Sequence, residues 1–192
     1  MSPSTTDLGS PRSDPQKTRV LLEAALRGDE ACWERLFSAH SGFLRHVLHA
    51  RRAQSAGVDV EEVLQDTLCR AWSNMKSFEY RGVGSLRRWL QRIAENSFVD
   101  HLRTRPDPST GQVDALADGD HADPEEQAQE RELTAKLYAS LARLQPSDRD
   151  IVIMRKLEGL TWEEICEIEG RPRTSVRRAY EQALNRLQAW MG

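Results

Sequence analysis

The sequence predicts an all-α protein built from two small helical domains, and three observations lead to this prediction. Apolar residues recur at helical spacing in both halves of the 192-residue chain, and no run shows the strict alternation of a half-buried strand. An acidic segment with few large apolar side chains separates the two halves. Hydrophobic residues make up 39% and charged residues 30% of the chain. This balance favours small helical units with wide solvated faces over one thick core.

Two segments have the composition of disordered chain. Residues 1–15 are rich in Ser, Pro, Thr and Asp, and we expect a disordered tail there. Residues 105–129 are predicted to be a flexible acidic linker. From Pro106 to Glu132 the chain has nine acidic residues and one arginine. A segment of this composition cannot bury enough apolar surface to offset the conformational entropy lost on ordering. The two domains are therefore expected at 16–104 and 130–192.

The N-terminal domain carries three amphipathic patterns, over 29–51, 59–78 and 85–103, with a helix-to-helix connection at 52–58. In the second pattern, Val60, Val63 and Leu64 belong to one apolar stripe, and acidic residues lie off it. The domain is predicted to be a bundle of helices.

The C-terminal domain has the pattern of a helix-turn-helix. Gly159 is expected to end one helix in left-handed conformation. Thr161 and Glu164 form a capping box that starts the next helix, which is short and stops at Gly170. A longer helix begins after Pro172. Two helices joined by a tight Gly-containing turn are typical of DNA-reading proteins.

The longer helix is strongly basic. From Arg171 to Gly192 the chain has five arginines and one acidic residue. Arginine suits phosphates and the paired acceptors of guanine, and glutamine suits adenine. An ordinary solvated basic face is the alternative. The candidate DNA contacts on this helix are Arg173, Thr174, Ser175, Arg177, Arg178 and Gln182.

Three segments together resemble one protein family. Residues 59–72 (DVEEVLQDTLCRAW) and 80–103 (YRGVGSLRRWLQRIAENSFVDHLR) closely resemble the two most diagnostic segments of the extracytoplasmic-function (ECF, group IV) RNA polymerase sigma factors. The C-terminal LARLQPSDRDIVIMRKLEGLTWEEICEIEG resembles that family's second domain. The resemblance covers about 16–104 and 130–190. It implies sigma region 2 in the first domain and sigma region 4, the helix-turn-helix domain, in the second.

The resemblance also implies roles for particular residues. The acidic helix would dock on the clamp coiled coil of the polymerase largest subunit, through Asp59, Glu61, Glu62, Gln65, Asp66 and Arg70. The following segment would recognise and melt the minus-ten element, where aromatic rings stack on single-stranded bases and cations hold phosphates. Its candidates are Tyr80, Arg81, Arg87, Arg88, Trp89, Arg92 and Asn96. Trp89 could equally be part of the core, and Tyr80 is the better candidate for the base pocket.

The basic helix would read the minus-thirty-five element, although this sequence departs from the family there. Arg171-Pro172-Arg173-Thr174 replaces the common apolar-Ser-Glu-Gly opening, and Glu181-Gln182 replaces a His-Arg type pair. The family's base preference therefore does not transfer to this chain. The resemblance implies core RNA polymerase, through the clamp coiled coil and the flap, and promoter DNA as partners. Many members of the family are also held inactive by an anti-sigma factor, which makes such a protein a further candidate partner.

Composition and spacing exclude several other classes. A net charge of −3 argues against a binder that works through bulk positive charge. Cys32, Cys69 and Cys166 are far apart, so we expect no zinc site, no disulfide framework and a reducing cytoplasm. We expect neither a secretory signal nor a membrane span, because the first 16 residues have no apolar core and no stretch approaches the roughly 18 apolar residues of a span. No residue cluster has catalytic spacing, so neither an enzyme nor a bound cofactor is expected.

Two alternatives remain open from the sequence. One is a conventional helix-turn-helix regulator that binds duplex DNA as a dimer, which leaves the acidic helix and the aromatic-basic segment unexplained. The other is a decoy that resembles a sigma factor and sequesters a regulator, against which the basic helix argues.

Overall fold

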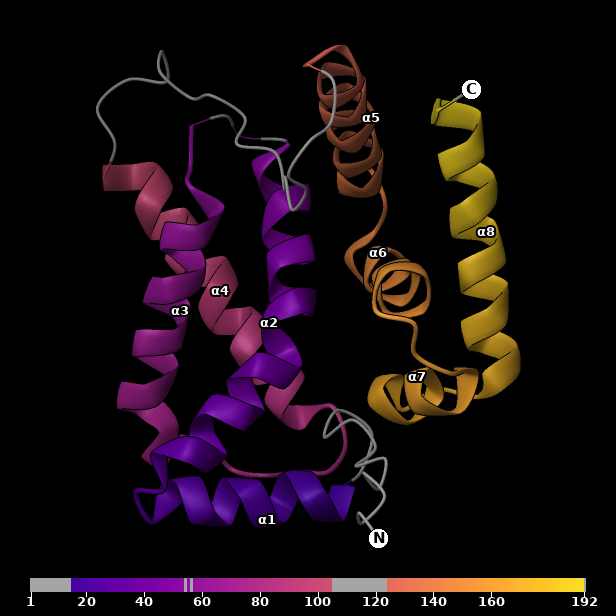
Figure 1. Ribbon diagram of the computed structural model, residues 1–192. Coiled ribbons are helices and arrows are strands. Elements are labelled where there is room, and N and C mark those ends of the chain that lie inside the picture. Colours follow the sequence, from indigo (N-terminus) through magenta and orange to yellow (C-terminus); the bar gives the residue numbers. More distant parts are fainter. Residues whose placement is uncertain (1–14, 54, 56, 105–123, 192) are drawn as a thin grey trace, which may run out of the picture.

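The described part of the chain is helical throughout. The computed structural model describes residues 15–53, 55, 57–104 and 124–191, and within these residues it contains helices and no strand. The prediction of an all-α fold is confirmed. Most of the predicted tail and residues 105–123 of the predicted linker lie outside the described residues. Figure 1 shows two groups of helices, one formed by the first half of the chain and one by the second.

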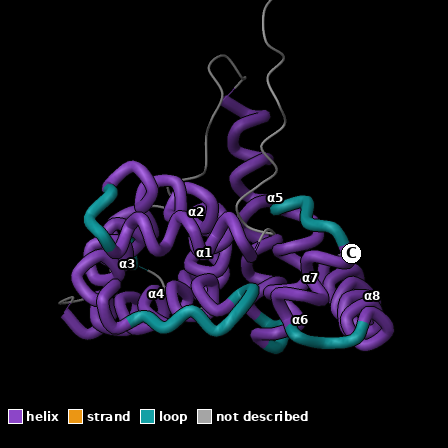
Figure 2. The backbone as a smooth tube through the Cα atoms, turned by 90° about the horizontal axis from the view of Figure 1, so that it is seen from below, coloured by secondary structure: helices purple, strands orange, loops and turns teal. Residues whose placement is uncertain are grey.

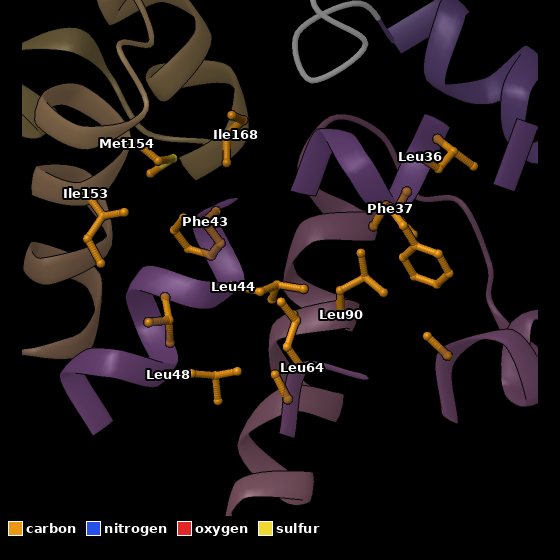
Figure 3. Close-up of a cluster of buried hydrophobic side chains, with 14 of the residues drawn as sticks. Leu36, Phe37, Phe43, Leu44, Leu48, Leu64, Leu90, Ile153, Met154 and Ile168 are labelled. Atoms are coloured by element: carbon orange, nitrogen blue, oxygen red, sulfur yellow. The ribbon is translucent and has the colours of Figure 1, made fainter. Parts of the chain in front are cut away.

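The N-terminal group is a bundle around α2. Its elements are α1 (Pro15–Leu26), α2 (Glu30–Arg52), α3 (Val60–Asn74), the 3₁₀ turn η1 (Met75–Ser77) and α4 (Ser85–Thr104). Helix α2 packs against α1, α3 and α4, and α3 packs against α4. Leu44, Leu64 and Leu90, one from each of the three long helices, meet in the core with 0%, 4% and 0% exposure (Figure 3). This core holds α3 and α4, the two helices with predicted binding residues, side by side.

The C-terminal group is organised around α8. Its elements are α5 (Pro124–Ala142), α6 (Pro146–Val152), the π-helical turn η2 (Ile153–Leu157), α7 (Trp162–Glu169) and α8 (Arg173–Met191). Helix α8 packs against α5, α6 and α7. Helix α5 begins at Pro124, inside the range assigned to the linker from the sequence, because proline is favoured in the first turn of a helix despite the polar composition.

The predicted signals of the helix-turn-helix are confirmed. Thr161 caps α7, its hydroxyl accepting from the Glu164 backbone N–H, and the Glu164 carboxylate accepts from the Thr161 N–H at 2.6 Å. Gly159 and Gly170 have φ of +70° and +66°, the left-handed region that glycine enters without steric cost. The π-helical turn η2, where the Glu158 N–H donates to the Ile153 carbonyl, was not predicted from the sequence.

Loss of the α7 cap should lower stability by a measurable amount. Thr161→Ala removes the side-chain acceptor and half of the capping box, so we expect the free energy of unfolding to fall by about 1 kcal/mol. Urea denaturation followed by circular dichroism measures this difference. Thr174→Ala, at an exposed position in α8, is the matched control and should change stability by less than about 0.5 kcal/mol. Equal stability of the two variants would contradict the capping role.

The two groups of helices pack against each other, which the sequence did not predict. One continuous cluster of buried apolar side chains contains Phe43 and Leu90 from the N-terminal group and Met154, Ile165 and Ile168 from the C-terminal group. Phe43 is directed from α2 toward Met154 and Ile168 (Figure 3). Figure 2 shows the two groups lying side by side in a second view. We call this contact, formed by α2 and α4 against α5, α6, η2 and α7, the interdomain seam.

Candidate polymerase and DNA interfaces

The predicted docking helix α3 presents some of its polar residues to solvent and uses others within the fold. Asp59 is its N-cap, accepting from the backbone N–H groups of Glu61 and Glu62 at 2.8 and 3.3 Å. Glu61 is held by the guanidinium of Arg45 on α2 through two hydrogen bonds, of 2.6 and 3.1 Å. This contact lowers the pKa of the Glu61 carboxyl. Gln65 is exposed, as is Glu62, whose side chain is 64% exposed.

The other two predicted docking residues belong to an ionic network between α3 and α4. Arg70 donates to Asp66 on its own helix at 3.1 Å and to Asp100 on α4 at 2.6 Å. The Arg70 contact lowers the pKa of the Asp100 carboxyl. The His101 ring lies between two carboxylates, 3.5 Å from Asp66 and 3.9 Å from Glu62. The network therefore fixes the orientation of the acidic face.

We call the surface formed by the exposed Glu62 and Gln65 and the half-buried Asp66 the acidic face. It is suited to basic partner helices, since complementary charge steers encounter and fixes register. Sequence reasoning missed the α4 side of this network. Asp100 lies near the end of the segment 80–103 that resembles the sigma factors, so that resemblance was the available signal; for His101 we find none.

On α4, three predicted minus-ten residues form an exposed stripe. Arg88, Arg92 and Asn96 are spaced four residues apart, which places them on one face of a helix, and all three are exposed. Tyr80 and Trp89 are half-buried and pack against the core, and the Trp89 ring lies 5.0 Å from the Phe78 ring. Arg81, in the loop before α4, is exposed and pairs with Glu79 at 2.9 Å.

Arg87 does not lie on the exposed stripe. It is 3% exposed, and its guanidinium lies 4.2 Å from the centre of the Phe43 ring. In this arrangement Arg87 cannot reach DNA, although the sequence predicted a contact. Arg87 lies three residues before Leu90 and seven before Ala94, so it shares their buried face. The arginine-rich character of the segment obscured this periodicity.

On α8, most predicted minus-thirty-five residues point away from the core. The inner face is formed by Val176, Ala179, Ala183 and Leu187. Arg173, Thr174, Arg177, Arg178 and Gln182 are exposed on the outer side. We call these five residues the outer face of α8.

Neighbouring residues orient part of this outer face. Arg173 pairs with Glu163 of α7, and the Arg177 guanidinium lies 5.6 Å from the centre of the Trp162 ring. Ser175 is half-buried and accepts from Arg171 at 3.0 Å, which makes it a supporting residue in this structure. The supporting residues Glu163, Trp162 and Arg171 were not predicted from the sequence.

An apolar groove lies on the C-terminal group, away from the outer face of α8. Its cavity volume is about 540 Å³. The groove is lined by Leu137 and Leu141 of α5, Leu157 of η2, and Leu184 and Met191 of α8, together with Lys156 and Gln188. Two of these lining side chains, Leu157 and Met191, are 38% and 42% exposed.

Two histidines of α2 lie against Tyr138 of α5 in the interdomain seam. The His49 ring is stacked on the Tyr138 ring with centroids 4.9 Å apart, and His46 Nδ1 is 2.8 Å from the Tyr138 hydroxyl. Burial, with a further contribution from Arg52, lowers the pKa of His49 to about 4. Burial also lowers the pKa of His46.

The His49 pKa predicts acid sensitivity of the folded chain. A histidine with a folded pKa near 4 and an unfolded value of 6.5 binds fewer protons when folded, so its contribution to stability is lost as pH falls from about 6.5 to 4. His49→Phe keeps a stacked ring and removes the titration. We therefore expect the variant to gain stability relative to the wild type as pH is lowered through this window. Urea denaturation of both chains from pH 7.5 to 4.5 measures the difference.

The stability of the wild type has to be compared with that of the variant at each pH, because other buried groups stabilise the fold as pH falls, opposite to the effect of His49. Burial raises the pKa of both Asp150 and Glu169, so their unfavourable contributions at neutral pH disappear on acidification. These contributions are common to both chains and cancel in the difference. If the difference in the free energy of unfolding between the wild type and His49→Phe did not change with pH, the lowered pKa of His49 would be contradicted.

The comparisons with known proteins agree with this geometry. Residues 36–106 match the family described as sigma-70 region 2, and residues 134–187 match the family described as sigma-70, region 4. Over 178 residues the chain is 26% identical to the ECF RNA polymerase sigma factor BldN of Streptomyces coelicolor, covering 91% of this chain and 66% of that protein. The chain belongs to the extracytoplasmic-function sigma factors. The region 2 match begins within α2 and includes α3 and α4, and the region 4 match begins within α5 and ends within α8.

Further relatives support the same family for this sigma factor. It is 25% identical over 187 residues to the ECF RNA polymerase sigma-E factor of Haemophilus influenzae, covering 90% of this chain and 96% of the relative. The solved structure of CnrH in complex with the cytosolic domain of CnrY resembles it with a TM-score of 0.53 and 22% identity, over 89% of this chain and 94% of the other. That likeness concerns the fold. Among the described residues, no helix of this sigma factor is long and apolar enough to cross a membrane, and no cluster of metal-binding side chains occurs.

Proposed function

We infer that this sigma factor binds core RNA polymerase and directs promoter-specific transcription initiation in the cytoplasm, acting by assembly and catalysing no reaction itself. The observation that carries this proposal is that one chain has two differently charged surfaces, one on each of its two groups of helices. The acidic face of α3 is suited to a basic protein partner. The outer face of α8 is suited to duplex DNA. A conventional regulator needs only the second of these surfaces.

Region 2 has the side chains that capture of a melted minus-ten strand requires. Arg88, Arg92 and Asn96 line one side of α4, and the half-buried Tyr80 precedes this helix. Stacking of a base on an aromatic ring contributes about 1–3 kcal/mol, which offsets much of the cost of unpairing one base. Tyr80 would supply the stack and the cations would hold the backbone.

The acidic face would dock on the clamp coiled coil of the largest polymerase subunit. Glu62 and Gln65 would make the direct contacts, because Asp59 and Glu61 are already engaged within the fold. Arg70, Asp100 and His101 would act by holding Asp66 in place. The apolar groove on region 4 would receive the flap, and an anti-sigma factor would compete for these surfaces.

The test is direct binding and transcription. The purified chain is mixed with bacterial core RNA polymerase, and gel filtration is followed by transcription of enriched genomic fragments. Co-migration with discrete start sites is the expected result. A chain that fails to bind core polymerase yet binds a specific duplex without it would be a conventional regulator. Failure of both kinds of binding would favour a decoy.

A further inference from the structure

Contacts with α7 hold two of the arginines of α8 to one side of that helix. Arg173 pairs with Glu163, and the Arg177 guanidinium lies 5.6 Å from the centre of the Trp162 ring. Both arginines are therefore oriented toward α7 and away from the middle of the exposed side of α8. The middle of that side is formed by a different set of residues.

A single line of polar side chains runs along the middle of the exposed side of α8. Its members follow one another at spacings of four, three and four residues, which places them on one face of a helix. All four are exposed: Thr174, Arg178, Glu181 and Asn185. The line lies opposite the buried face that contains Val176 and Ala183, on a helix at the edge of the C-terminal group (Figure 1). We call these four residues the central line of α8.

Glu181 differs in charge from the segment around it. It is the single acidic residue from Arg171 to Gly192, a segment with five arginines. Arg177 and Arg178 precede it by four and three residues, within pairing distance on a helix. Even so, the Glu181 carboxylate forms no ion pair with any residue that the structure describes. Beside DNA, such a carboxylate is repelled by the phosphates and is accommodated where a base offers it a hydrogen-bond donor.

The position of Glu181 along α8 is suited to reading a base. In one class of helix-turn-helix proteins, side chains at i, i+3, i+4 and i+7 of the recognition helix contact base edges in the major groove. Counted from Thr174, these positions are Arg177, Arg178 and Glu181. At about 1.5 Å per residue, Thr174 and Glu181 lie about 10 Å apart along the helix, the length of about three base pairs. Glu181 therefore lies within reach of the same short stretch of groove as Thr174.

The pattern of donors in the major groove indicates which base suits a carboxylate. Guanine presents only acceptors there, and thymine presents an acceptor and a methyl group, so neither can donate to Glu181. Adenine presents its N6 amino group beside the acceptor N7, which repels a second carboxylate oxygen. Cytosine presents its N4 amino group without an acceptor of its own beside it. A carboxylate on the central line therefore accepts best from cytosine.

We propose that Glu181 is a specificity-determining residue of this sigma factor, which accepts a hydrogen bond from the N4 amino group of a cytosine in the minus-thirty-five element. The assignment rests on the proposed function, because it gives a base to the surface with which region 4 would read promoter DNA. The carboxylate contributes specificity more than affinity, since it binds one base and is repelled by phosphates at every other sequence. It also gives a base preference to the Glu181-Gln182 pair, at which this chain departs from its family.

The test replaces the carboxylate with groups of different hydrogen-bonding chemistry. Glu181→Gln keeps the shape of the side chain and supplies the donor and acceptor that match adenine, whereas Glu181→Ala removes the contact. Gln and Ala are good helix formers and position 181 is exposed, so α8 should stay folded, which circular dichroism checks. Glu130→Gln, the same loss of charge at an exposed position of α5, is the matched control.

Base preference is measured by selection from a promoter library. Each full-length chain is assembled with core RNA polymerase, and the complex selects from duplexes in which the minus-thirty-five region is randomised. The bound duplexes are sequenced, and dissociation constants are then measured for duplexes that differ at one base pair. The same library is also offered to each chain without polymerase.

We expect the wild type and Glu130→Gln to favour cytosine at one position, by about 5- to 30-fold over the other bases. Glu181→Gln should favour adenine at that position, and Glu181→Ala should have no preference there. Identical base preferences in all four chains would overturn the proposal. A uniform gain in affinity for every sequence in the Glu181 variants, with unchanged preferences, would also overturn it, because Glu181 would then only repel phosphates.

Binding to core polymerase separates this proposal from the proposed function. A wild-type chain that binds core polymerase and selects promoters with the same base preferences as Glu181→Gln would retain the sigma function and refute the assignment of Glu181. A chain that fails to bind core polymerase, yet alone selects duplexes in which the preferred cytosine becomes adenine in Glu181→Gln, would do the reverse. Failure to select any duplex, with or without polymerase, would refute both.

Discussion

Reversing the charge of Glu62 should weaken binding to core RNA polymerase by about 30-fold or more. Removing one partner of an interfacial charge pair costs about 2–5 kcal/mol, and reversal adds repulsion. Glu62 is the most informative position on the acidic face, because its side chain is 64% exposed and its ionic contact with the His101 ring is long, at 3.9 Å. Glu62→Lys should therefore leave the fold intact. Titration of labelled chain with core polymerase measures the loss.

A matched variant separates the effect of the position of the substitution from the effect of the change in net charge. Glu130→Lys makes the same charge change at an exposed position of α5, outside the acidic face, and should bind core polymerase nearly as well as the wild type. Asp66→Lys is less informative, because it also disrupts the pairing of Arg70. If Glu62→Lys and Glu130→Lys bound core polymerase with equal affinity, Glu62 on α3 would not be part of the docking surface.

Truncating Arg178 should weaken promoter recognition by about 5- to 150-fold. A bidentate contact from an arginine to a base contributes about 1–3 kcal/mol of discrimination, and Arg178 is exposed on the outer face of α8. Arg178→Ala in the polymerase complex is compared with the wild type on a recovered promoter and on versions mutated in the minus-thirty-five region. If Arg178 reads a base, one of these DNA mutations should lose its effect in the variant.

The control for this prediction lies on the same helix. Arg186 pairs with Asp148 at 3.8 Å and lies beyond the outer face, so Arg186→Ala should change promoter affinity little. A uniform loss across all DNA sequences, with a salt dependence reduced by about one charge, would instead identify Arg178 as a phosphate contact. Unchanged binding would exclude Arg178 from the interface.

Much of the fold was predictable because its signals are local. The capping box of Thr161 and Glu164 and the glycines that end helices at 159 and 170 each act within one helical turn, so a single sequence contains the whole interaction. The inward and outward faces of α8 follow from the helical period alone. The exposure of most of the predicted site residues was predictable for the same reason, and their roles stay predictions.

The interactions that were missed connect residues far apart in the chain. Arg45 holds Glu61 from another helix, and Arg88 meets Ile168 eighty residues later, so neither pair has a spacing that a local pattern can reveal. Arg87 was predicted to contact DNA because of its chemistry, although the period of α4 places it inward. At Gly42 and Gly84 an added Cβ would lie 2.7 Å from atoms of Glu158 and Ile168, and the sequence cannot show that a glycine makes room for a distant segment until that segment is in place.

The relative orientation of the two groups of helices depends on the number of residues in the π-helical turn Ile153–Leu157. Within it the Glu158 N–H reaches back five residues to Ile153, one residue more than in an α-helix. Each residue of an α-helix turns the chain by about 100°. Deleting one residue here would therefore rotate Glu158 away from Gly42 of α2, where an added Cβ would lie 2.7 Å from the Glu158 carboxylate, while every amino acid on α4 and α8 stays the same. Insertions and deletions of one residue at this turn would thus change how the two groups of helices pack without changing the side chains on either surface.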